Sequence, residues 1–372
     1  MTKITALFFV ILILLTACTA AAPLSPPTAG LIAEEPSAAL TNVPLAAGYG
    51  VDGGWFELYF TNPSSPLASQ ITGGIDLPLV DAIDAARLSV DVAMYSLSLN
   101  SIRDALLRAH DRGVRVRMVM ESDNLDRADP QKLKDAGVPI LGDRREGLMH
   151  NKFVVIDNSE VWTGSTNLTD SGAYLDNNSM IRIRSVKVAE DFTKEFEEMF
   201  IDDKFGDYIV PETPNPYVTI DGTSVEVYFA PDDNVQARLE DIINSAQESI
   251  YFMMFSFTAD PLGEAVRARA EKGVTVAGVM DAEQVDSNVG TEFDPFRQAG
   301  LDVYRDGNEG QMHHKVMVID ESIVILGSYN FTNSAETRND ENLLVIHNKD
   351  IAARILKEFQ RVYQQSQQVI SK

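Results

Sequence analysis

Residues 149–157 read Met-His-Asn-Lys-Phe-Val-Val-Ile-Asp, and Gly164-Ser165-Thr166-Asn167 follow shortly afterwards. A second copy, Met312-His313-His314-Lys315-Val316-Met317-Val318-Ile319-Asp320 followed by Gly327-Ser328-Tyr329-Asn330, lies further along the chain. Counted from each first histidine, both copies have Lys at +2, Asp at +7, Gly at +14, Ser at +15 and Asn at +17. Alternate residues of a strand share one face. Each copy is therefore predicted to present an imidazole beside an ammonium group, on a strand fixed by its apolar residues.

The repetition extends to the sequence before the motif. The apolar, strand-like runs 88–96 and 249–256 are each followed by an amphipathic stretch, 101–112 or 262–272, by Gly113 or Gly273, and by a second strand-like run, 114–120 or 274–280. Glycine is typical of a helix C-terminus. Strand–helix–strand units with short connections predict an α/β fold with a parallel or mixed sheet covered by helices.

The chain length of 372 residues suits two or three domains. Between the copies lies the proline-rich segment Pro211-Glu212-Thr213-Pro214-Asn215-Pro216, which indicates a linker. We therefore predict two α/β lobes, residues 50–210 and 217–370. Each is expected to be a mixed β-sheet flanked by helices, and the lobes are expected to be related by a pseudo-twofold axis.

The N-terminus indicates export. After Lys3, the apolar run 6–15 is too short to span a bilayer, and Leu15-Thr16-Ala17-Cys18 resembles the lipobox of bacterial lipoproteins. We expect residues 1–17 to be a signal peptide, Cys18 to carry lipid and residues 18–48 to be a flexible tether. The protein would then be anchored to the bacterial cell envelope. An uncleaved anchor helix or an ordinary secretory peptide is the alternative.

Composition narrows the class of function. The formal net charge is −24, which disfavours a polybasic nucleic-acid binder but leaves room for a local basic groove. Cys18 is the only cysteine, so the chain forms no intramolecular disulfide and no cysteine-based metal cluster.

The two motifs resemble the signature HxK(x)4D(x)6GSxN of the phospholipase D superfamily. The resemblance implies a shared pocket in which His150, Lys152 and Asn167 face His313, Lys315 and Asn330. One imidazole would attack phosphorus, and the other would protonate the leaving oxygen and then activate water. The lysines and asparagines, together with Ser165 and Ser328, are expected to bind the phosphate oxygens. We expect no metal or other cofactor, because no carboxylate cluster accompanies the motifs.

A difference between the copies bears on the roles of the two histidines. At +28 from its own motif histidine, the first copy has Asn178 and the second has Glu341. In the superfamily this position usually holds an acid that hydrogen-bonds the histidine of the opposite lobe. The resemblance therefore implies that Glu341 holds His150 and that Asn178 faces His313. We expect His150 to be the nucleophile and His313 the general acid and then base.

Other residues near the motifs are given structural roles. Asp157 and Asp320 are expected to order the turns after their strands, as supporting residues. His314 alternates to the face opposite His313 and is expected to be packed or at the surface. Arg144 and Arg145 are expected in a solvated loop, with the rim of the substrate groove as the alternative.

The motif leaves the substrate open. The acidic composition and the expected lipid anchor favour hydrolysis of a phosphatidylcholine-type phospholipid, with phospholipid and the membrane surface as partners. A nuclease is the alternative, since residues 327–336 are similar to the same region of small bacterial endonucleases of the superfamily. Phosphatidyl transfer, as in cardiolipin synthases, and non-enzymatic phosphate binding are further alternatives. Both motifs lie in one chain, so a monomer is expected to suffice.

Overall fold

The structure of this chain, a computed structural model, describes residues 40–206 and 211–370, with the side chains up to residue 368. The expected signal peptide, Cys18 and the tether up to residue 39 lie outside the described residues.

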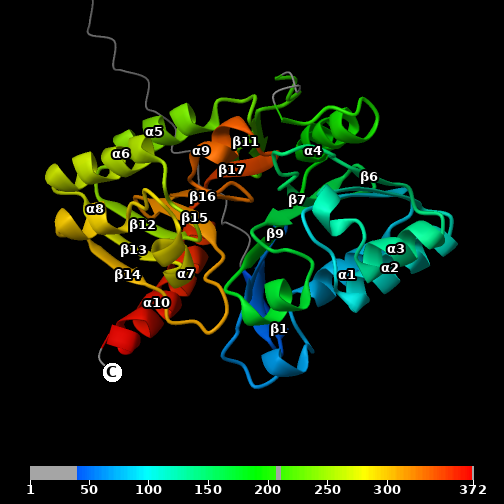
Figure 1. The fold of residues 1–372 in the computed structure, drawn as a ribbon, viewed down its shortest axis with the longest axis horizontal. Helices are drawn as coiled ribbons and strands as arrows, with labels where there is room; N and C mark the ends of the chain where they lie inside the picture. The colour runs from blue at the N-terminus through cyan, green and yellow to red at the C-terminus, as the bar shows by residue number, and fades with distance from the viewer. Residues whose placement is uncertain (1–39, 207–210, 371–372) are drawn as a thin grey trace, which may run out of the picture. The chain divides into compact units, whose positions relative to one another are not determined.

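Two mixed β-sheets form the framework (Figure 1). The strands of the first sheet are β1 (Thr41–Leu45), β2 (Gly48–Asp52), β3 (Phe56–Thr61), β4 (Ser89–Met94), β5 (Arg115–Met120), β6 (Ile140–Gly142), β7 (Lys152–Ile156), β8 (Glu160–Gly164) and β9 (Ser179–Arg184). Those of the second are β10 (Tyr217–Ile220), β11 (Thr223–Ala230), β12 (Ser249–Met254), β13 (Thr275–Met280), β14 (Asp302–Arg305), β15 (Lys315–Ile319), β16 (Ile323–Gly327) and β17 (Glu341–His347).

The two sheets have the same strand order. The first runs β3-β9-β8-β7-β4-β5-β6 from its third strand, and the second runs β11-β17-β16-β15-β12-β13-β14 from its second. In each sheet the helix-connected pair, β4–β5 or β12–β13, is parallel, and the motif strand beside it is antiparallel. This confirms the prediction of two mixed α/β sheets.

Helices cover both faces of each sheet. They are α1 (Asp76–Ala85), α2 (Asn100–Asp111), α3 (Ala128–Asp135), α4 (Val186–Phe200), α5 (Val235–Ser245), α6 (Asp260–Glu271), α7 (Ala282–Ser287), α8 (Phe293–Gln298), α9 (Asn333–Thr337) and α10 (Lys349–Ile370), with the short turns η1 (Ala68–Gln70), η2 (Ser122–Asn124) and η3 (Ser171–Leu175). The expected helices 101–112 and 262–272 are α2 and α6. Gly113 and Gly273 follow them with φ values of 85° and 91°, a region that glycine enters without the Cβ penalty.

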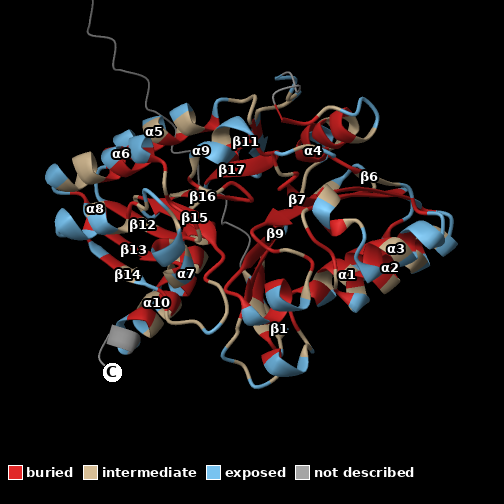
Figure 2. Cartoon of the chain, in the orientation of Figure 1, coloured by how far each residue is buried: buried red, intermediate tan, exposed pale blue. Residues whose placement is uncertain are grey.

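Three hydrophobic clusters hold the layers together. One lies between the first sheet and helices α1–α3, and another lies between the second sheet and helices α5, α6 and α8. The third contains buried residues of both sheets and of α4 and α10, including Phe153, Phe192, Phe229 and Phe359. Figure 2 shows both sheets buried between helices that expose their outer sides. The two halves therefore share one central core, which fixes their motif strands relative to each other.

The tether prediction is wrong at its C-terminal end. Residues 18–48 were expected to be flexible, yet Thr41–Leu45 form β1, which pairs antiparallel with β2. Val43 and Leu45 pack against the core of the first sheet. Pro44 is tolerated because β1 is an edge strand. The small and polar composition of this segment concealed a short hairpin.

Among the described helices, none is long and apolar enough to cross a membrane.

Candidate active site

Reciprocal pairing between the halves brings the two motifs together. The segment just before β7 bridges the segment just before β17, and the His150 amide donates to the carbonyl of Asp340 at 3.0 Å. In the same way, the segment before β15 bridges the segment before β9, and the His313 amide donates to the carbonyl of Asn177 at 2.9 Å. Each motif histidine thus precedes its strand and is held by backbone of the other half.

The side chains of the histidines are also held across the halves. Nδ1 of His150 lies 2.8 Å from both carboxyl oxygens of Glu341. Nδ1 of His313 lies 3.0 Å from Oδ1 of Asn178. These are the contacts expected from the sequence. Both residues are buried, with 8% and 5% of their surface exposed. Because Nδ1 of each ring already has a partner, Nε2 is the nitrogen left for a substrate.

The motif lysines lie beside the histidines and are almost completely buried. Nζ of Lys152 donates to the carbonyl of His150 at 2.9 Å, and Nζ of Lys315 donates to the carbonyl of His313 at 3.0 Å. The Lys315 ammonium also lies 3.2 Å from Nε2 of His313. Two buried ammonium groups in one site attract an anion such as a phosphodiester.

Asn167 and Asn330 follow the Gly-Ser pair of each motif. Their Oδ1 atoms are buried and have no hydrogen-bond partner among the described residues. A buried amide without a partner is costly, and a bound ligand is one way to complete it. The unpartnered oxygen can accept from a substrate donor, whereas a phosphate oxygen would need a hydrogen bond from the Nδ2 group of the same amide.

The predicted phosphate contacts of the two serines are corrected by the structure. Oγ of Ser165 donates to Oδ1 of Asn178 at 2.8 Å, and Oγ of Ser328 donates to Oε2 of Glu341 at 2.6 Å. A hydroxyl has one proton to donate. Each serine therefore positions the residue that holds a histidine instead of donating to phosphate.

The two motifs, their spacing and their pairing across the halves agree with a comparison of the sequence with protein families. The family described as "Cardiolipin synthase, PLD-like domain" matches residues 79–200 and 239–363, one region in each half. The chain belongs to the phospholipase D superfamily.

Named relatives within the superfamily match one part of the chain. The mitochondrial cardiolipin hydrolase of Homo sapiens is 32% identical over 133 residues, which cover 36% of this chain and 52% of that protein. The phospholipase D of Rickettsia bellii is 27% identical over 163 residues, covering 42% of this chain and 81% of that protein. The chain thus spans about half the length of the cardiolipin hydrolase it matches.

A solved structure shares the two-lobed fold. The phosphatidylserine synthase of Haemophilus influenzae matches 83% of this chain and 86% of its own, with a TM-score of 0.60 and 15% identity. The likeness shows that the two chains share a fold over most of their length.

Burial sets the electrostatics of the superfamily motifs in this chain. Burial and the neighbouring ammonium groups lower the pKa of both His150 and His313. Burial also lowers the pKa of Lys152 to about 7 and raises the pKa of Glu341 to about 8. A bound phosphate anion would raise the pKa of the lysines again, because an opposite charge favours the charged form.

His150 and Glu341 titrate as a pair, because their charges interact at hydrogen-bond distance. In the form with a neutral imidazole and an ionised Glu341, the pair keeps only the proton on Nδ1. This Nδ1–H donates to the carboxylate, and Nε2 has a free lone pair. That tautomer is the nucleophilic one.

The spacing of +7 that Asp157 and Asp320 share in the two copies has a structural reason. The carboxylate of Asp157 accepts from the amides of residues 87–89, and that of Asp320 accepts from the amides of residues 247–249. Both aspartates therefore cap the turn that leads into the neighbouring strand, β4 or β12. They have positive φ values of 53° and 49°, which Asp tolerates better than most residues.

Two pairs of site residues were missed by the sequence interpretation. The ring of Tyr95 packs edge-on against His150, and that of Phe255 packs edge-on against His313. These rings also lie 5.3 Å and 4.8 Å from the ammonium groups of Lys152 and Lys315. The sequence held a signal for these two residues. Both are aromatic, and each lies one residue before the equivalent Ser96 or Ser256 of the repeat.

The second missed pair consists of the acids that directly follow β5 and β13. Oε2 of Glu121 accepts from the amide of Met149 at 3.0 Å, and Oδ2 of Asp281 accepts from the amide of Met312 at 2.9 Å. Each acid thus positions the residue before a motif histidine. Both copies of the repeat end their second strand in an acid, which was the signal in the sequence.

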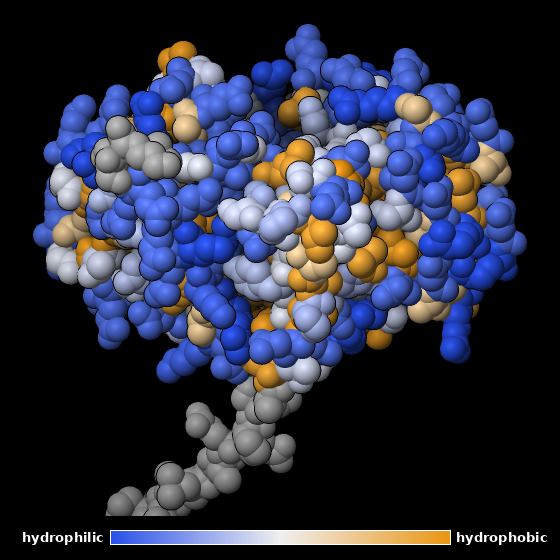
Figure 3. Space-filling model, turned by 90° about the horizontal axis from the view of Figure 1, so that it is seen from below, coloured by the Kyte–Doolittle hydropathy of each residue, from blue (hydrophilic) through white to orange (hydrophobic). Residues whose placement is uncertain are grey.

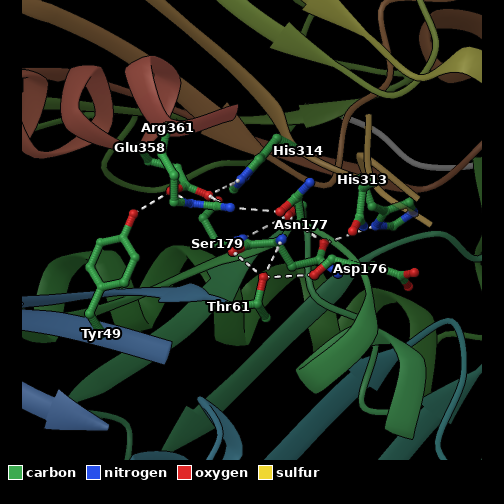
Figure 4. Close-up of polar contacts among 12 residues, drawn as sticks. Tyr49, Thr61, Asp176, Asn177, Ser179, His313, His314, Glu358 and Arg361 are labelled. Atoms are coloured by element: carbon green, nitrogen blue, oxygen red, sulfur yellow. Dashed lines mark hydrogen bonds and ion pairs between the residues drawn. The ribbon is translucent and has the colours of Figure 1, made fainter. Parts of the chain in front are cut away.

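His314 is packed, one of the two outcomes expected for it. It is fully buried, and its Nε2 lies 3.2 Å from Oε1 of Glu358. Glu358 is held by two charge-assisted hydrogen bonds from Arg361, which also donates to Oδ1 of Asn177 at 2.7 Å. Figure 4 shows Arg361 between Glu358 and Asn177, with His314 and Tyr49 on the same carboxylate.

Arg145 is mostly buried and forms contacts within the protein, unlike a residue of a solvated loop. Its guanidinium donates to Oδ2 of the buried Asp340 at 2.5 Å and to the backbone of Arg338. It thereby joins the first half to the second. Arg144 forms an exposed ion pair with Asp203, as a solvated loop residue does.

A cavity of about 390 Å³ lies next to the His313 side of the site. Its lining is acidic and includes Asp176, Asp281 and Asp306. It borders the site because Gln311 and Asp176, which line it, immediately precede the bridged pair Met312 and Asn177.

Within residues 40–206 and 211–370, no three His, Cys, Asp or Glu side chains are grouped so that they could hold a metal ion.

Proposed function

We propose that this chain is a metal-independent phosphodiesterase that hydrolyses the headgroup ester of a phospholipid through a phosphohistidine intermediate. The observation that carries the proposal is the reciprocal pairing of the motifs. Each His–Lys pair is completed by a residue of the other half, Glu341 for His150 and Asn178 for His313.

The chemistry has two displacements at phosphorus. Nε2 of His150 attacks phosphorus while the bond to the headgroup oxygen breaks, and His313 gives its proton to that oxygen. His313 then takes a proton from water, which attacks phosphorus and breaks the bond to His150. Lys152, Lys315 and the two motif asparagines stabilise the negative charge on the non-bridging oxygens in both steps.

The assignment of roles rests on the two partners. A carboxylate at Nδ1 of His150 stabilises the cationic phosphohistidine and fixes the tautomer that attacks. The neutral amide of Asn178 gives imidazolium at His313 less support, so His313 parts with its proton more readily.

Two features support a phospholipid with a cationic headgroup, such as phosphatidylcholine, which would yield phosphatidic acid. The acidic cavity lies on the side of His313, where the leaving group departs under our assignment. A relative in Rickettsia bellii is named phospholipase D. The same cavity and the net charge of −24 disfavour a nucleic-acid strand.

Cardiolipin is a second candidate substrate. It is favoured by the relatives named mitochondrial cardiolipin hydrolase, which are 32% identical over about a third of this chain. Vesicles of phosphatidylcholine, vesicles containing cardiolipin, and single- and double-stranded DNA, each incubated separately with the protein, distinguish these substrates by their products. Phosphatidyl transfer would show as a new lipid when an alcohol is added.

Trapping the intermediate tests the mechanism. In the presence of EDTA, His313→Ala should accumulate labelled phosphate on His150 from a phosphodiester whose leaving group is p-nitrophenol, because this group needs no general acid. His150→Ala is the matched control and should carry no label. Label on His313 in His150→Ala, with none in His313→Ala, would reverse the roles. A requirement for added Mg²⁺ or Ca²⁺ would refute metal independence.

We further propose that the protein is exported and anchored through lipid on Cys18. The lipobox-like sequence before this single cysteine supports the proposal. Labelled palmitate should enter the wild-type chain, and Cys18→Ser should release an exported protein from the membrane. Equal labelling of both would contradict the assignment.

A further inference from the structure

A groove away from the paired histidines lies between the hairpin edge of the first sheet and helix α10. It encloses about 370 Å³, within the range of small-molecule sites. Val43, Pro44 and Tyr49, which keep exposed surface, form one side of it, and Val51, Leu58 and Phe60 also line it with 5% or less of their surface exposed. Leu58 and Phe60 are almost completely buried members of the central core, so this wall is rigid.

The other side of the groove is basic. Arg354, Lys357 and Arg361 line it from α10. Their spacing of three and then four residues places them on one face of the helix. Within the part of the chain that the structure describes, no carboxylate lines the groove. A cationic stripe of this kind stands out in a chain with a net charge of −24.

One of the three cations is already neutralised. Arg361 donates two hydrogen bonds to the buried Glu358, whose pKa its guanidinium lowers to about 2 in spite of burial. Arg361 also reaches Asn177, whose carbonyl accepts from the His313 amide (Figure 4). Arg361 therefore has a structural role next to the paired histidines of the candidate active site. Arg354 and Lys357, the latter exposed, remain as the cations that an occupant would meet.

We infer that this groove binds an anionic phospholipid of a bilayer, with acyl carbons on the apolar wall and the phosphate at Arg354 and Lys357. An apolar wall beside a cationic stripe complements an amphiphile that carries negative charge. Figure 3 views the side of the molecule on which β1 lies in Figure 1, and apolar side chains gather near the middle of that face beside strongly hydrophilic ones.

The position of the groove in the chain agrees with such an occupant. Strand β1, which contributes Asn42, Val43 and Pro44, is the first described strand and begins 23 residues after Cys18. At about 3.5 Å per residue or less, that length keeps the groove near a membrane if Cys18 carries lipid. The groove binds through α10 and the hairpin, so its occupancy does not depend on the chemistry of the histidines.

Vesicle flotation tests the inference on the full chain carrying Cys18→Ser, so that lipid attached at Cys18 cannot account for binding. The flotation chain also carries His150→Ala, so that it cannot convert the vesicles to anionic phosphatidic acid. We expect this protein to float with phosphatidylcholine vesicles that contain phosphatidylglycerol and much less with pure phosphatidylcholine. Arg354→Gln with Lys357→Gln should weaken this binding about tenfold or more, because each cation contributes to attraction by an anionic surface. Val43→Glu, which places a negative charge on the apolar wall, should do the same.

The matched control is Lys132→Gln with Lys134→Gln, which removes two exposed cations from α3. It should leave binding unchanged. With His150 intact, the Arg354/Lys357 variant and the α3 control should melt at the wild-type temperature and cleave bis(p-nitrophenyl) phosphate at the wild-type rate. Absence of that cleavage in the wild type would count against the proposed function, while the flotation result would still decide on the groove.

Three results would overturn the inference. The first is full binding by both groove variants. The second is an equal loss in the α3 control, which would indicate attraction by overall charge. The third is a loss in Lys152→Gln without a loss in the groove variants, which would place the lipid at the paired histidines.

Discussion

The two halves of the molecule repeat one fold and one motif, but they surround their histidines with different charges. At the start of β17 the second half has Asp340 and Glu341, and just before β9 the first half has Asn177 and Asn178. Because each segment serves the opposite histidine, both acids lie on the side of His150 and both amides on the side of His313. Because the two segments differ in charge, two histidines of one symmetric fold have different surroundings.

Local structure explains why position 178 is an amide. Asn178 accepts from Ser165 through Oδ1, and its Nδ2 donates to the carbonyl of Gly172 at 2.9 Å. Gly172 belongs to the single π-helical turn η3, where the second half has the short helix α9. A carboxylate at position 178 would place an oxygen against that carbonyl. At position 341, Ser328 and His150 both face the carboxylate as donors.

The largest effect is expected from making the His150 side resemble the His313 side. Glu341→Gln should lower kcat/KM about 10²–10³-fold, because an amide cannot stabilise the cationic phosphohistidine. It should also remove the rise of kcat/KM with pH that the His150–Glu341 pair causes, since the activity of the wild type increases as the pair loses its proton. Activity against pH on a soluble phosphodiester measures both.

A merely structural role for Glu341 predicts a different result. In that case the melting temperature would fall together with activity, and the shape of the pH profile would stay unchanged. A loss of less than about threefold with the wild-type profile would mean that the two sides are equivalent and that the comparison carries no mechanistic weight.

A smaller effect is expected from the reverse exchange. Asn178→Asp places a negative charge beside His313 and raises the pKa of this histidine from its lowered value. A general acid must be protonated, so activity declines as pH rises through the pKa of His313. In the variant this decline should occur at a higher pH than in the wild type. We expect the ratio of kcat/KM at pH 8 to that at pH 6 to increase, by about tenfold at most.

Asn178→Asp should also lose some stability, because the new carboxylate faces the carbonyl of Gly172. Asn178→Ala is the control for that loss, since it removes the same amide hydrogen bond without adding charge. A pH profile of Asn178→Asp that matches the wild type would contradict the assignment of His313 as general acid.

Much of the fold and of the candidate site could be predicted from the sequence, because the sequence repeats. Two copies of strand, helix and motif predict two like sheets, and fixed offsets predict which lysine accompanies which histidine. The resemblance to the superfamily, applied at position +28, implies the contacts of Glu341 and Asn178. Neither the spacing nor the resemblance needs knowledge of how the loops pack.

The remaining features depend on packing that no single offset encodes. The hydroxyls of Ser165 and Ser328 face the partners of the histidines because of the turns after β8 and β16. The ion pair of Arg145 with Asp340 joins residues 195 positions apart. The hairpin that begins at Thr41 is stable only because Val43 and Leu45 meet the core of the first sheet.

The smallest effect is expected where the two halves agree. Asp157 and Asp320 cap equivalent turns with the same set of three amides, so Asp157→Asn and Asp320→Asn should destabilise the fold equally, by about 1–2 kcal/mol each. Asn tolerates the positive φ of both positions, so the substitution removes charge without adding backbone strain.

The amide hydrogen bonds lower the pKa of both aspartates below the ordinary value of 3.8. Their contribution is therefore complete above pH 4 and is lost as pH falls through the lowered pKa. Urea unfolding at pH 7 and again near pH 3 measures this, and the difference from wild type should shrink at the lower pH in both variants. A loss in one half more than twice that in the other would show that the halves differ in stability as well as in charge, and the asymmetry could then no longer be ascribed to positions 178 and 341 alone.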